Sequence, residues 1–316
     1  MSWSFPKFVR IREDGPRDGF QMERQFIPTE QKIAMINALL ETGLPRVEVT
    51  SFVHPKWIPQ LADGDEVIRR INQRPNVAYA VLVPNMRGVG RAIAARDGGA
   101  KIDELVFVIS ASESHNQANL NRSIAQSLTE MAELVRGAKA AGFRTAAGAA
   151  CAFGCPFEGH VPPEKVIEIL EEEQRFGVDE FVIPDTIGCA NPVAVRDLFA
   201  RARRALGDVE LTAHFHNTRG AGLANVVAAM LEGVDSFETA FGELGGCPYA
   251  PGATGNIATE DLVCMLHEMG IETGVDLEKL IACAKLAQQA VGRDLPSHVL
   301  HAGPVNWEGE GQGCAR

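Results

Sequence analysis

Two histidines, His214 and His216, flank Phe215 at the end of a predicted buried strand. Residues i and i+2 of a strand point to the same face, so both imidazoles can face one ligand. Two histidines joined by an oxygen ligand from elsewhere make a divalent-metal site. The same spacing also occurs in polar surface strands and in hydrogen-bonded core pairs, and the two histidines alone do not decide between these interpretations.

A second candidate segment runs from Glu13 to Gly19 and brings a cation and a carboxylate together at Arg17 and Asp18. The glycines on both sides of this pair, Gly15 and Gly19, let the backbone turn tightly around a ligand. A surface turn with a local ion pair is the alternative, and such a pair contributes little to stability. If the turn lies near the histidines, Asp18 can supply the oxygen that they lack.

The third candidate segment, Gly245–Asn256, contains glycines and prolines around one thiol, Cys247, and one carboxamide, Asn256. This composition is typical of a loop whose main chain approaches a ligand or closes over it. Asn256 offers a neutral oxygen ligand. The alternative is a plain connector in which Cys247 packs as a small apolar side chain.

Short apolar runs alternate with segments of helical periodicity along the chain. The candidate strands are Phe8–Glu13, Arg46–Thr50, Val77–Val83, Glu104–Ser110, Thr145–Ala152, Glu180–Ile183, Glu210–His216 and Ser236–Ala240. The helical patterns are Thr29–Glu41, Ile124–Ala141, Pro163–Phe176, Pro192–Leu206, Leu223–Glu232, Glu260–Met269 and Leu277–Val291. Strands that alternate with helices predict an α/β protein with a parallel sheet.

Eight strand–helix units in about 240 residues match the size of a (β/α)₈ TIM barrel. A doubly wound open sheet is the alternative, but no G-x-G-x-x-G follows the first strand. We expect a single catalytic domain over 1–316, with the barrel at about 8–258 and a helical C-terminal extension at about 259–316. In a closed barrel the first strand neighbours the eighth, so the three candidate segments meet at the C-terminal end of the strands.

Together these segments predict a metal centre formed by Asp18, His214, His216 and Asn256, next to Arg17 and Cys247. Oxygen and imidazole ligands suit several divalent ions, and the sequence does not choose among them. A metal held in this way lowers the pKa of a bound hydroxyl group, as it does for bound water.

Composition narrows the class of partner. The chain has 316 residues and a formal net charge of −11, which argues against nucleic-acid binding because that binding requires a basic face. No run of 18 or more apolar residues is present, so we expect no membrane span. The N-terminus resembles neither a signal nor a transit peptide, and seven cysteines without a secretory signal favour reduced thiols in the cytoplasm.

The motifs resemble those of the 3-hydroxy-3-methylglutaryl-CoA lyase family, metal-dependent lyases built on a (β/α)₈ barrel. The resemblance runs from about Val9 to Gly292. The matching motifs are Gly15-Pro16-Arg17-Asp18-Gly19, Glu48-Val49-Thr50-Ser51-Phe52-Val53, Pro55-Lys56-Trp57, Asp185-Thr186-Ile187-Gly188, His214-x-His216, and Gly245–Asn256 with the following Ala258-Thr259-Glu260-Asp261-Leu262. The loop with Cys247 is the most specific of these, because it separates the lyase from the condensing members of the family.

The resemblance implies a retro-Claisen cleavage that yields acetyl-CoA and acetoacetate, as a step of leucine degradation. It implies that Asp18, His214, His216 and Asn256 bind Mg²⁺ or Mn²⁺, that Arg17 stabilises an enolate oxygen, and that Cys247 donates a proton. Asp18 or His214 would relay the proton of the substrate hydroxyl. The implied substrate-binding residues are Arg17, Glu48, Ser51, Asn116 and Asp185. A homodimer is also implied.

The chain departs from the family pattern in three places, and these departures bear on the acyl chain rather than on the reaction type. His216 is followed by Asn217-Thr218-Arg219-Gly220 in place of Asp-Thr-Tyr-Gly, Pro184 stands where glycine is expected, and small residues near Ala146 replace a more polar strand. Citramalyl-CoA, cleaved to acetyl-CoA and pyruvate, is therefore an alternative substrate. The chain could also be a Claisen condensing enzyme or a catalytically silent metal-binding barrel.

Overall fold

The computed structural model describes residues 4–246, 255–305 and 307. Eight parallel strands close into a barrel in the order β1-β10-β9-β8-β5-β4-β3-β2. Their bounds are Arg10–Glu13 (β1), Arg46–Ser51 (β2), Ala78–Leu82 (β3), Glu104–Ser110 (β4), Arg144–Ala150 (β5), Glu180–Asp185 (β8), Glu210–Phe215 (β9) and Ser236–Thr239 (β10). The predicted (β/α)₈ barrel is confirmed, and each predicted strand is present.

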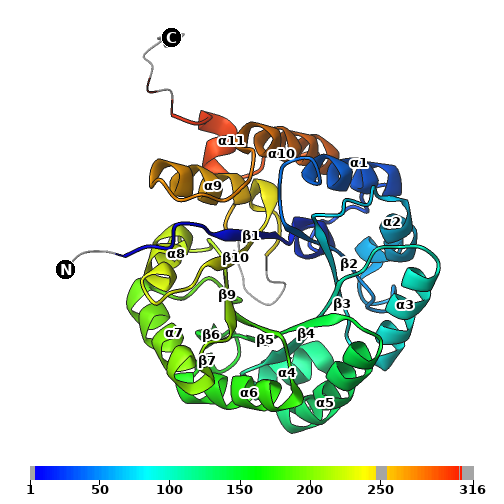
Figure 1. Cartoon of the computed structure of the whole chain (residues 1–316), viewed down its shortest axis with the longest axis vertical. Coiled ribbons are helices and arrows are strands. Elements are labelled where there is room, and N and C mark those ends of the chain that lie inside the picture. Colours follow the sequence, from blue (N-terminus) through cyan, green and yellow to red (C-terminus); the bar gives the residue numbers. More distant parts are fainter. Residues whose placement is uncertain (1–3, 247–254, 306, 308–316) are drawn as a thin grey trace.

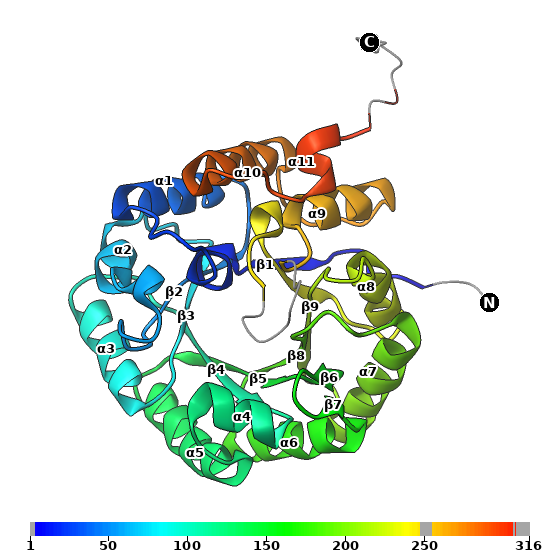
Figure 2. The same ribbon diagram turned by 180° about the vertical axis from the view of Figure 1, so that it is seen from behind.

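Helices form an outer ring around the strands (Figures 1 and 2). They are Thr29–Leu39 (α1), Gly64–Arg70 (α2), Met86–Asp97 (α3), Glu113–Leu120 (α4), Ile124–Ala140 (α5), Pro163–Phe176 (α6), Pro192–Leu206 (α7), Gly222–Met230 (α8), Thr259–Glu268 (α9), Leu277–Val291 (α10) and His298–Ala302 (α11). The last three make the predicted C-terminal extension, in which α10 lies beside α1 (Figure 1). No helix in the described part of the chain is long and apolar enough to span a membrane.

Four of these helices were not predicted: the short α11 of the C-terminal extension, and α2, α3 and α4 of the ring, which lack the usual pattern. The short helix α2 begins at a glycine, and α3 contains Gly88 and Gly90, which are weak helix formers. Helix α4 buries only two polar side chains, His115 and Asn116, so it has no apolar face. A short hairpin, β6 (Gly154–Cys155) with β7 (Gly159–His160), also follows β5.

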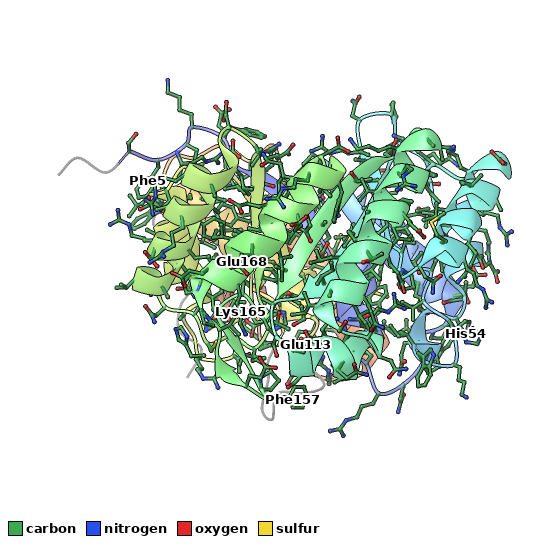
Figure 3. All side chains as sticks on the ribbon, turned by 90° about the horizontal axis from the view of Figure 1, so that it is seen from below. Phe5, His54, Glu113, Phe157, Lys165 and Glu168 are labelled. Atoms are coloured by element: carbon green, nitrogen blue, oxygen red, sulfur yellow. The ribbon has the colours of Figure 1, made fainter. Side chains whose placement is uncertain are left out.

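The C-terminal ends of the strands face one end of the barrel. His54 follows β2 and Phe157 lies in the β6–β7 turn, and Figure 3 shows both residues near the same lower edge of the molecule. Phe5, which precedes β1, lies toward the opposite end. Side chains at the ends of different strands therefore share one mouth.

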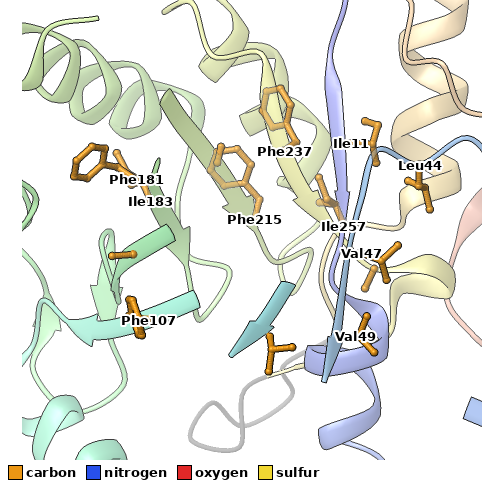
Figure 4. Packing of buried hydrophobic residues seen from close by; sticks show 14 of the residues in the cluster. Ile11, Leu44, Val47, Val49, Phe107, Phe181, Ile183, Phe215, Phe237 and Ile257 are labelled. Carbon is orange, nitrogen blue, oxygen red and sulfur yellow. The ribbon is translucent and has the colours of Figure 1, made fainter. Parts of the chain in front are cut away.

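Successive side chains of each strand point alternately outward and inward, and in several strands the outward ones are apolar while inward ones are charged. Phe215 of β9 packs edge-on against Phe199 of α7, with ring centroids 6.5 Å apart, and Phe181 and Phe237 belong to the same buried cluster (Figure 4). Because successive side chains of a strand point to opposite faces, the neighbours of these residues point into the barrel. His214 and Glu238 are two such neighbours.

The barrel interior is crossed by ion pairs. The guanidinium of Arg12 pairs with Glu180 and, at 2.7 Å, with Glu104, while Arg46 pairs with Glu104 at 2.8 Å and with Glu238 at 3.4 Å. All five side chains are buried. Paired charges can be accommodated in a low-dielectric interior, whereas a single unpaired charge is strongly unfavourable there.

We therefore expect Arg12→Met to lower the free energy of unfolding by about 3–5 kcal/mol, because it leaves Glu104 and Glu180 with one cation fewer. Chemical denaturation monitored by circular dichroism measures this change. The control is Arg70→Met, which removes an exposed arginine paired with Glu30 and Glu66, and it should leave the unfolding free energy nearly unchanged. Equal effects of the two substitutions would contradict this account of the interior.

Candidate metal centre

A π-helical turn, Gly15–Gly19, directly follows β1 and carries Arg17 and Asp18. All five of its residues are buried. A Cβ atom on Gly15 would lie 2.5 Å from the Phe241 ring, and one on Gly19 would lie 2.7 Å from Leu244 Cβ. Glycine at both positions lets the turn pack against the segment after β10, and this contact places Asp18 at the mouth of the barrel.

His214 lies in β9, and His216 follows the end of that strand. Their Nε2 atoms are 3.0 Å apart. Asn256 reaches them because its segment pairs back to the end of β9: His216 and Asn256 form a bridge, and Ile257 N donates to Phe215 O at 2.9 Å. The backbone thus joins the end of β9 to Asn256, which lies 40 positions beyond His216 in the chain.

The structure brings the four predicted ligands together. Ligand atoms of Asp18, His214 and His216 all lie within 4.8 Å of one another, and Asn256 Nδ2 donates to Asp18 Oδ2 at 2.9 Å. All four side chains are buried. Asn256 Oδ1 and His216 Nδ1 have no hydrogen-bond partner within the described residues. A buried, unsatisfied amide oxygen is costly unless it binds a ligand.

The cluster fits a divalent cation. Two ligand atoms bound side by side at about 2.1 Å to one octahedral ion lie about 3.0 Å apart, which is the separation of the two Nε2 atoms. Burial, and then the neighbouring His214, lower the pKa of His216 to about 3, so its imidazole is neutral as a metal ligand must be. Burial alone would raise the pKa of Asp18, but Arg17 and the two histidines outweigh burial and lower it, so Asp18 is anionic.

Arg17 is the cation beside this cluster. Its Nε donates to Glu48 Oε1 at 2.7 Å, its terminal nitrogens reach Asp14 and Glu48, and it forms an ion pair with Asp18. Burial would lower the pKa of Arg17, but Glu48, Asp18 and Asp14 together raise it above its usual value. Arg17 is thus a fixed positive charge next to the proposed ligands, suited to an oxyanion.

The other predicted substrate-binding residues have structural partners. Asp185, at the end of β8, accepts hydrogen bonds from the backbone N–H groups of Cys189 and Ala190, each at 2.9 Å. Burial raises the pKa of Asp185. Ser51 ends β2 and accepts a hydrogen bond from Val53 N at 3.1 Å. Both residues lie at C-terminal strand ends, and their binding roles stay predictions.

Asn116 is held elsewhere. It lies in α4, and its amide is bonded to Ser110 N, to Arg122 O and to Ser127 Oγ at 2.8–3.0 Å. None of these hydrogen bonds joins it to the four clustered residues, and its substrate-binding role stays a prediction. Cys247 lies outside the described residues.

Sequence reasoning missed two carboxylates behind His214. Its Nδ1 lies 3.1 Å from Glu238 Oε2 and 3.8 Å from Asp14 Oδ2. Burial would raise the pKa of Glu238, but the hydrogen bond with His214 and the charges of Arg46 and Arg12 lower it. Burial, Glu238 and Glu48 raise the pKa of Asp14. For Glu238 the available signal was a charged residue in the middle of the predicted apolar strand Ser236–Ala240, which indicates an inward-facing ion, whereas Asp14 lies just after the predicted strand Phe8–Glu13.

Sequence reasoning also missed Glu243. It is buried in the left-handed region, with φ of 58°, and it accepts a hydrogen bond from Asn217 Nδ2 at 3.1 Å. Glu243 lies near Asp261 and His298, but Asp261 is already bonded to Ser297 Oγ and to the first N–H groups of α11. The position of Asp261 beside Glu243 and His298 is therefore explained by its hydrogen bonds to the N-terminus of α11.

Two surface hollows lie away from the cluster. One of about 420 Å³ lies between α6 and α7, and one of about 470 Å³ lies between α5 and α6. Glu113, Lys165 and Glu168 line the second on the outer wall of the barrel (Figure 3). Neither hollow includes a clustered side chain, so the candidate site rests on ligand chemistry rather than on cavity size.

A family model and curated proteins match this chain over nearly its whole length. A family model described as HMGL-like matches residues 9–287. The hydroxymethylglutaryl-CoA lyase YngG of Bacillus subtilis is 46% identical over 94% of this chain and 97% of that protein. The mitochondrial hydroxymethylglutaryl-CoA lyase of Bos taurus is 44% identical over 95% of this chain and 90% of its own length.

Solved structures agree with these relatives. The Bacillus subtilis HMG-CoA lyase has a TM-score of 0.91 at 45% identity and covers 94% of this chain and 98% of its own. An HMG-CoA lyase from Acinetobacter baumannii, in complex with coenzyme A and 3-methylmalate, has a TM-score of 0.90 at 41% identity. That match covers 96% of this chain and 97% of the other.

Gly245 provides a test of the cluster that changes no ligand. Its φ is 110°, and an added Cβ would lie 2.6 Å from Asn256 Nδ2 and 3.2 Å from Asp18 Oδ2. We expect Gly245→Ala to displace these two side chains and to weaken Mn²⁺ binding by about 10–100-fold, measured by titration with electron paramagnetic resonance (EPR) detection.

The matched control is Gly99→Ala. Gly99 also has a positive φ, of 95°, but nothing lies within 4 Å of its added Cβ. This variant carries the backbone strain without the contact, and its Mn²⁺ affinity should equal that of the unsubstituted protein. Unchanged affinity in Gly245→Ala would contradict the assignment of Asp18 and Asn256 as ligands.

Proposed function

The chain belongs to the HMGL-like family, and from this premise we propose that it is a divalent-metal-dependent carbon–carbon lyase that cleaves 3-hydroxy-3-methylglutaryl-CoA into acetyl-CoA and acetoacetate. The observation that carries the proposal is the buried cluster of Asp18, His214, His216 and Asn256 beside the fixed charge of Arg17. Mg²⁺ or Mn²⁺ suits this set of oxygen and imidazole ligands.

The reaction moves one proton off the substrate and one proton back. The hydroxyl on C3 loses its proton, the C2–C3 bond breaks as C3 becomes the ketone of acetoacetate, and the bond electrons remain on the acetyl-CoA fragment as an enolate. Protonation of C2 then completes acetyl-CoA. A tertiary alcohol is about as weak an acid as water, whose pKa is about 15.7, so the hydroxyl needs help at neutral pH.

A divalent ion held by the four side chains would lower the pKa of that hydroxyl. Asp18 or His214 would accept its proton. Arg17 would stabilise the enolate oxygen that develops on the thioester, because a preorganised buried charge is most effective where charge appears. Glu48 would hold Arg17 in place through its 2.7 Å ion pair.

The remaining roles follow from the resemblance. Cys247 would donate the proton to C2, since a thiol with a reference pKa of about 8.5 is protonated at pH 7. Glu48, Ser51, Asp185 and Asn116 are proposed substrate-binding positions. Because the last three are proposed to bind the substrate and are given no part in the bond-breaking or proton-transfer steps, we expect their substitution to change KM more than kcat.

We also propose a single catalytic domain, a homodimer, a cytoplasmic location and a step in leucine degradation. The homodimer and the degradation step are supported by the resemblance, and the location by the cysteine usage of the sequence. Citramalyl-CoA as substrate, or a condensing reaction, is not favoured, because the similar curated proteins are hydroxymethylglutaryl-CoA lyases.

A substrate panel tests the function. We expect acetyl-CoA release from 3-hydroxy-3-methylglutaryl-CoA, loss of that release with EDTA, and its return with Mg²⁺ or Mn²⁺. Both citramalyl-CoA enantiomers should react at least about 10-fold more slowly, because a misfitted acyl chain loses about 1–3 kcal/mol of transition-state binding. Faster cleavage of citramalyl-CoA would show that citramalyl-CoA is the preferred substrate. Undiminished acetyl-CoA release in EDTA would contradict the proposed metal dependence.

A second test concerns the thiol. Cys247→Ala should lower kcat by about 10²–10⁴-fold, the usual contribution of a general acid. Mn²⁺ affinity should not change, since Cys247 is not a proposed ligand. Cys283→Ala is the control, because Cys283 is buried in α10 and has no proposed role. Near-normal turnover of Cys247→Ala would show that another group protonates the enolate.

A further inference from the structure

The imidazole of His214 has two different surroundings. Its Nε2 faces His216 Nε2 at 3.0 Å, on the side of the proposed ligands. Its Nδ1 faces Glu238 Oε2 at 3.1 Å, on the side of the barrel interior. The ring is therefore held from behind by a group that is not itself a proposed ligand.

Strand pairing places Glu238. Its Cα is the register partner of the His214 Cα across the β9–β10 pair, and both side chains point into the barrel. Glu238 is only 4% exposed. Its Oε1 atom lies 3.4 Å from Arg46 and 3.7 Å from Arg12 Nε, which leaves Oε2 for His214. Two guanidinium groups hold this carboxylate as an anion.

An ionised carboxylate can only accept a hydrogen bond. The short contact with Oε2 therefore requires that Nδ1 of His214 carries the hydrogen. In a neutral imidazole the lone pair then lies on Nε2, which is the nitrogen that faces the proposed cation. With that lone pair on the cation, His214 has none left to accept the substrate's proton, so of the two acceptors named above this tautomer leaves Asp18. A carboxylate behind a metal-binding histidine commonly fixes both the tautomer and the orientation of the ring.

A second cation site among Asp14, Glu238 and His214 is a less consistent interpretation, although their ligand atoms also lie within 4.8 Å of one another. Arg46 already donates to Asp14 at 3.1 Å and to Glu238 at 3.4 Å, and Arg17 reaches Asp14 at 3.4 Å. Two guanidinium groups thus occupy the positions from which these acids would contact a cation.

We propose that Glu238 is a positioning residue of the reaction, which selects the Nδ1–H tautomer of His214 and directs its Nε2 lone pair at the metal centre. This inference rests on the metal centre proposed above. It assigns a role in the reaction to a carboxylate that touches neither the substrate nor the metal. Removal of the Glu238 carboxylate should therefore lower the affinity of the protein for the metal.

Metal binding by Glu238→Gln provides the first measurement. The glutamine amide can present its NH₂ group to Nδ1 as well as its oxygen, so it no longer selects one tautomer. We expect Mn²⁺ affinity, measured on the apoprotein by EPR titration, to fall by about 10–100-fold. Glu238→Asp keeps the charge, and we expect it to retain most of the affinity.

The matched control is Glu104→Gln. Glu104 is equally buried and pairs with the same Arg12 and Arg46, but its ion pairs are with arginines and none involves His214. Glu104→Gln therefore removes one carboxylate charge from the same network as Glu238→Gln does. The loss of unfolding free energy, measured by chemical denaturation, should be similar in the two variants. Equal loss of Mn²⁺ affinity in both variants would show that the network charge, and not the contact with His214, is responsible, and would overturn the proposal.

Histidine ¹⁵N chemical shifts in the unsubstituted protein with Mg²⁺ supply a readout that requires no stable variant. We expect His214 to show a protonated Nδ1 and an unprotonated Nε2. The opposite tautomer would overturn the proposal even if every variant bound metal poorly.

The two proposals fail in different ways. If His216→Ala leaves Mn²⁺ affinity unchanged, the metal centre is wrong, and the role of Glu238 falls with it. If His216→Ala abolishes binding while Glu238→Gln keeps both the affinity and the tautomer, the metal centre stands and the role of Glu238 is wrong.

Discussion

The pairing of buried charges inside the barrel is the constraint on which the site depends. A barrel of this size has an interior filled by side chains, and here many of them are ions. Arg12 and Arg46 pair with five buried carboxylates, four contributed by different strands and one by Asp14, the residue after β1. Each carboxylate is stable in this interior only with its arginine partner, so the ions constrain one another's positions. The network reaches the mouth, where Arg17 and Asp18 continue it.

Closure of the barrel converts this pairing into a site. Because β1 pairs with β10 and β10 pairs with β9, the turn with Asp18 lies beside residues that are about 200 positions away in sequence. His214 is fixed by its strand and by Glu238 behind it, and His216 by the end of the same strand and its bridge to Asn256. Asp18 and Asn256 come from connecting segments and are fixed by their contact with each other and with glycines that leave room for it. Half of the cluster is thus positioned by strand register and half by close backbone packing.

The sequence predicted the part of this arrangement that follows from local pattern. Alternation in His214-Phe215-His216 indicated a shared face, and the order of strands and helices indicated the barrel, which together led to the four clustered residues. The hydrogen bonds of Asn116 were not predictable, because its partners Ser110, Arg122 and Ser127 belong to different elements. Helix α4 was missed for a related reason, because it has no apolar stripe. Its N-cap residue Ser112 bonds to His115 N within the helix and also to Cys155 Sγ from the segment after β5.

Glu238 shows why the interior was harder to predict than the mouth. A glutamate in a strand is ordinarily a surface residue, and only the burial of Phe237 beside it, on the helix-covered side, implies that Glu238 points inward. Even then its partner depends on the register between β9 and β10, since a shift of one residue would place Glu238 beside Ala213 or Phe215 instead of His214. The contact with His214 therefore depends on the pairing of β9 with β10. Residues that position a metal ligand can be identified as the register partners of that ligand on the neighbouring strands.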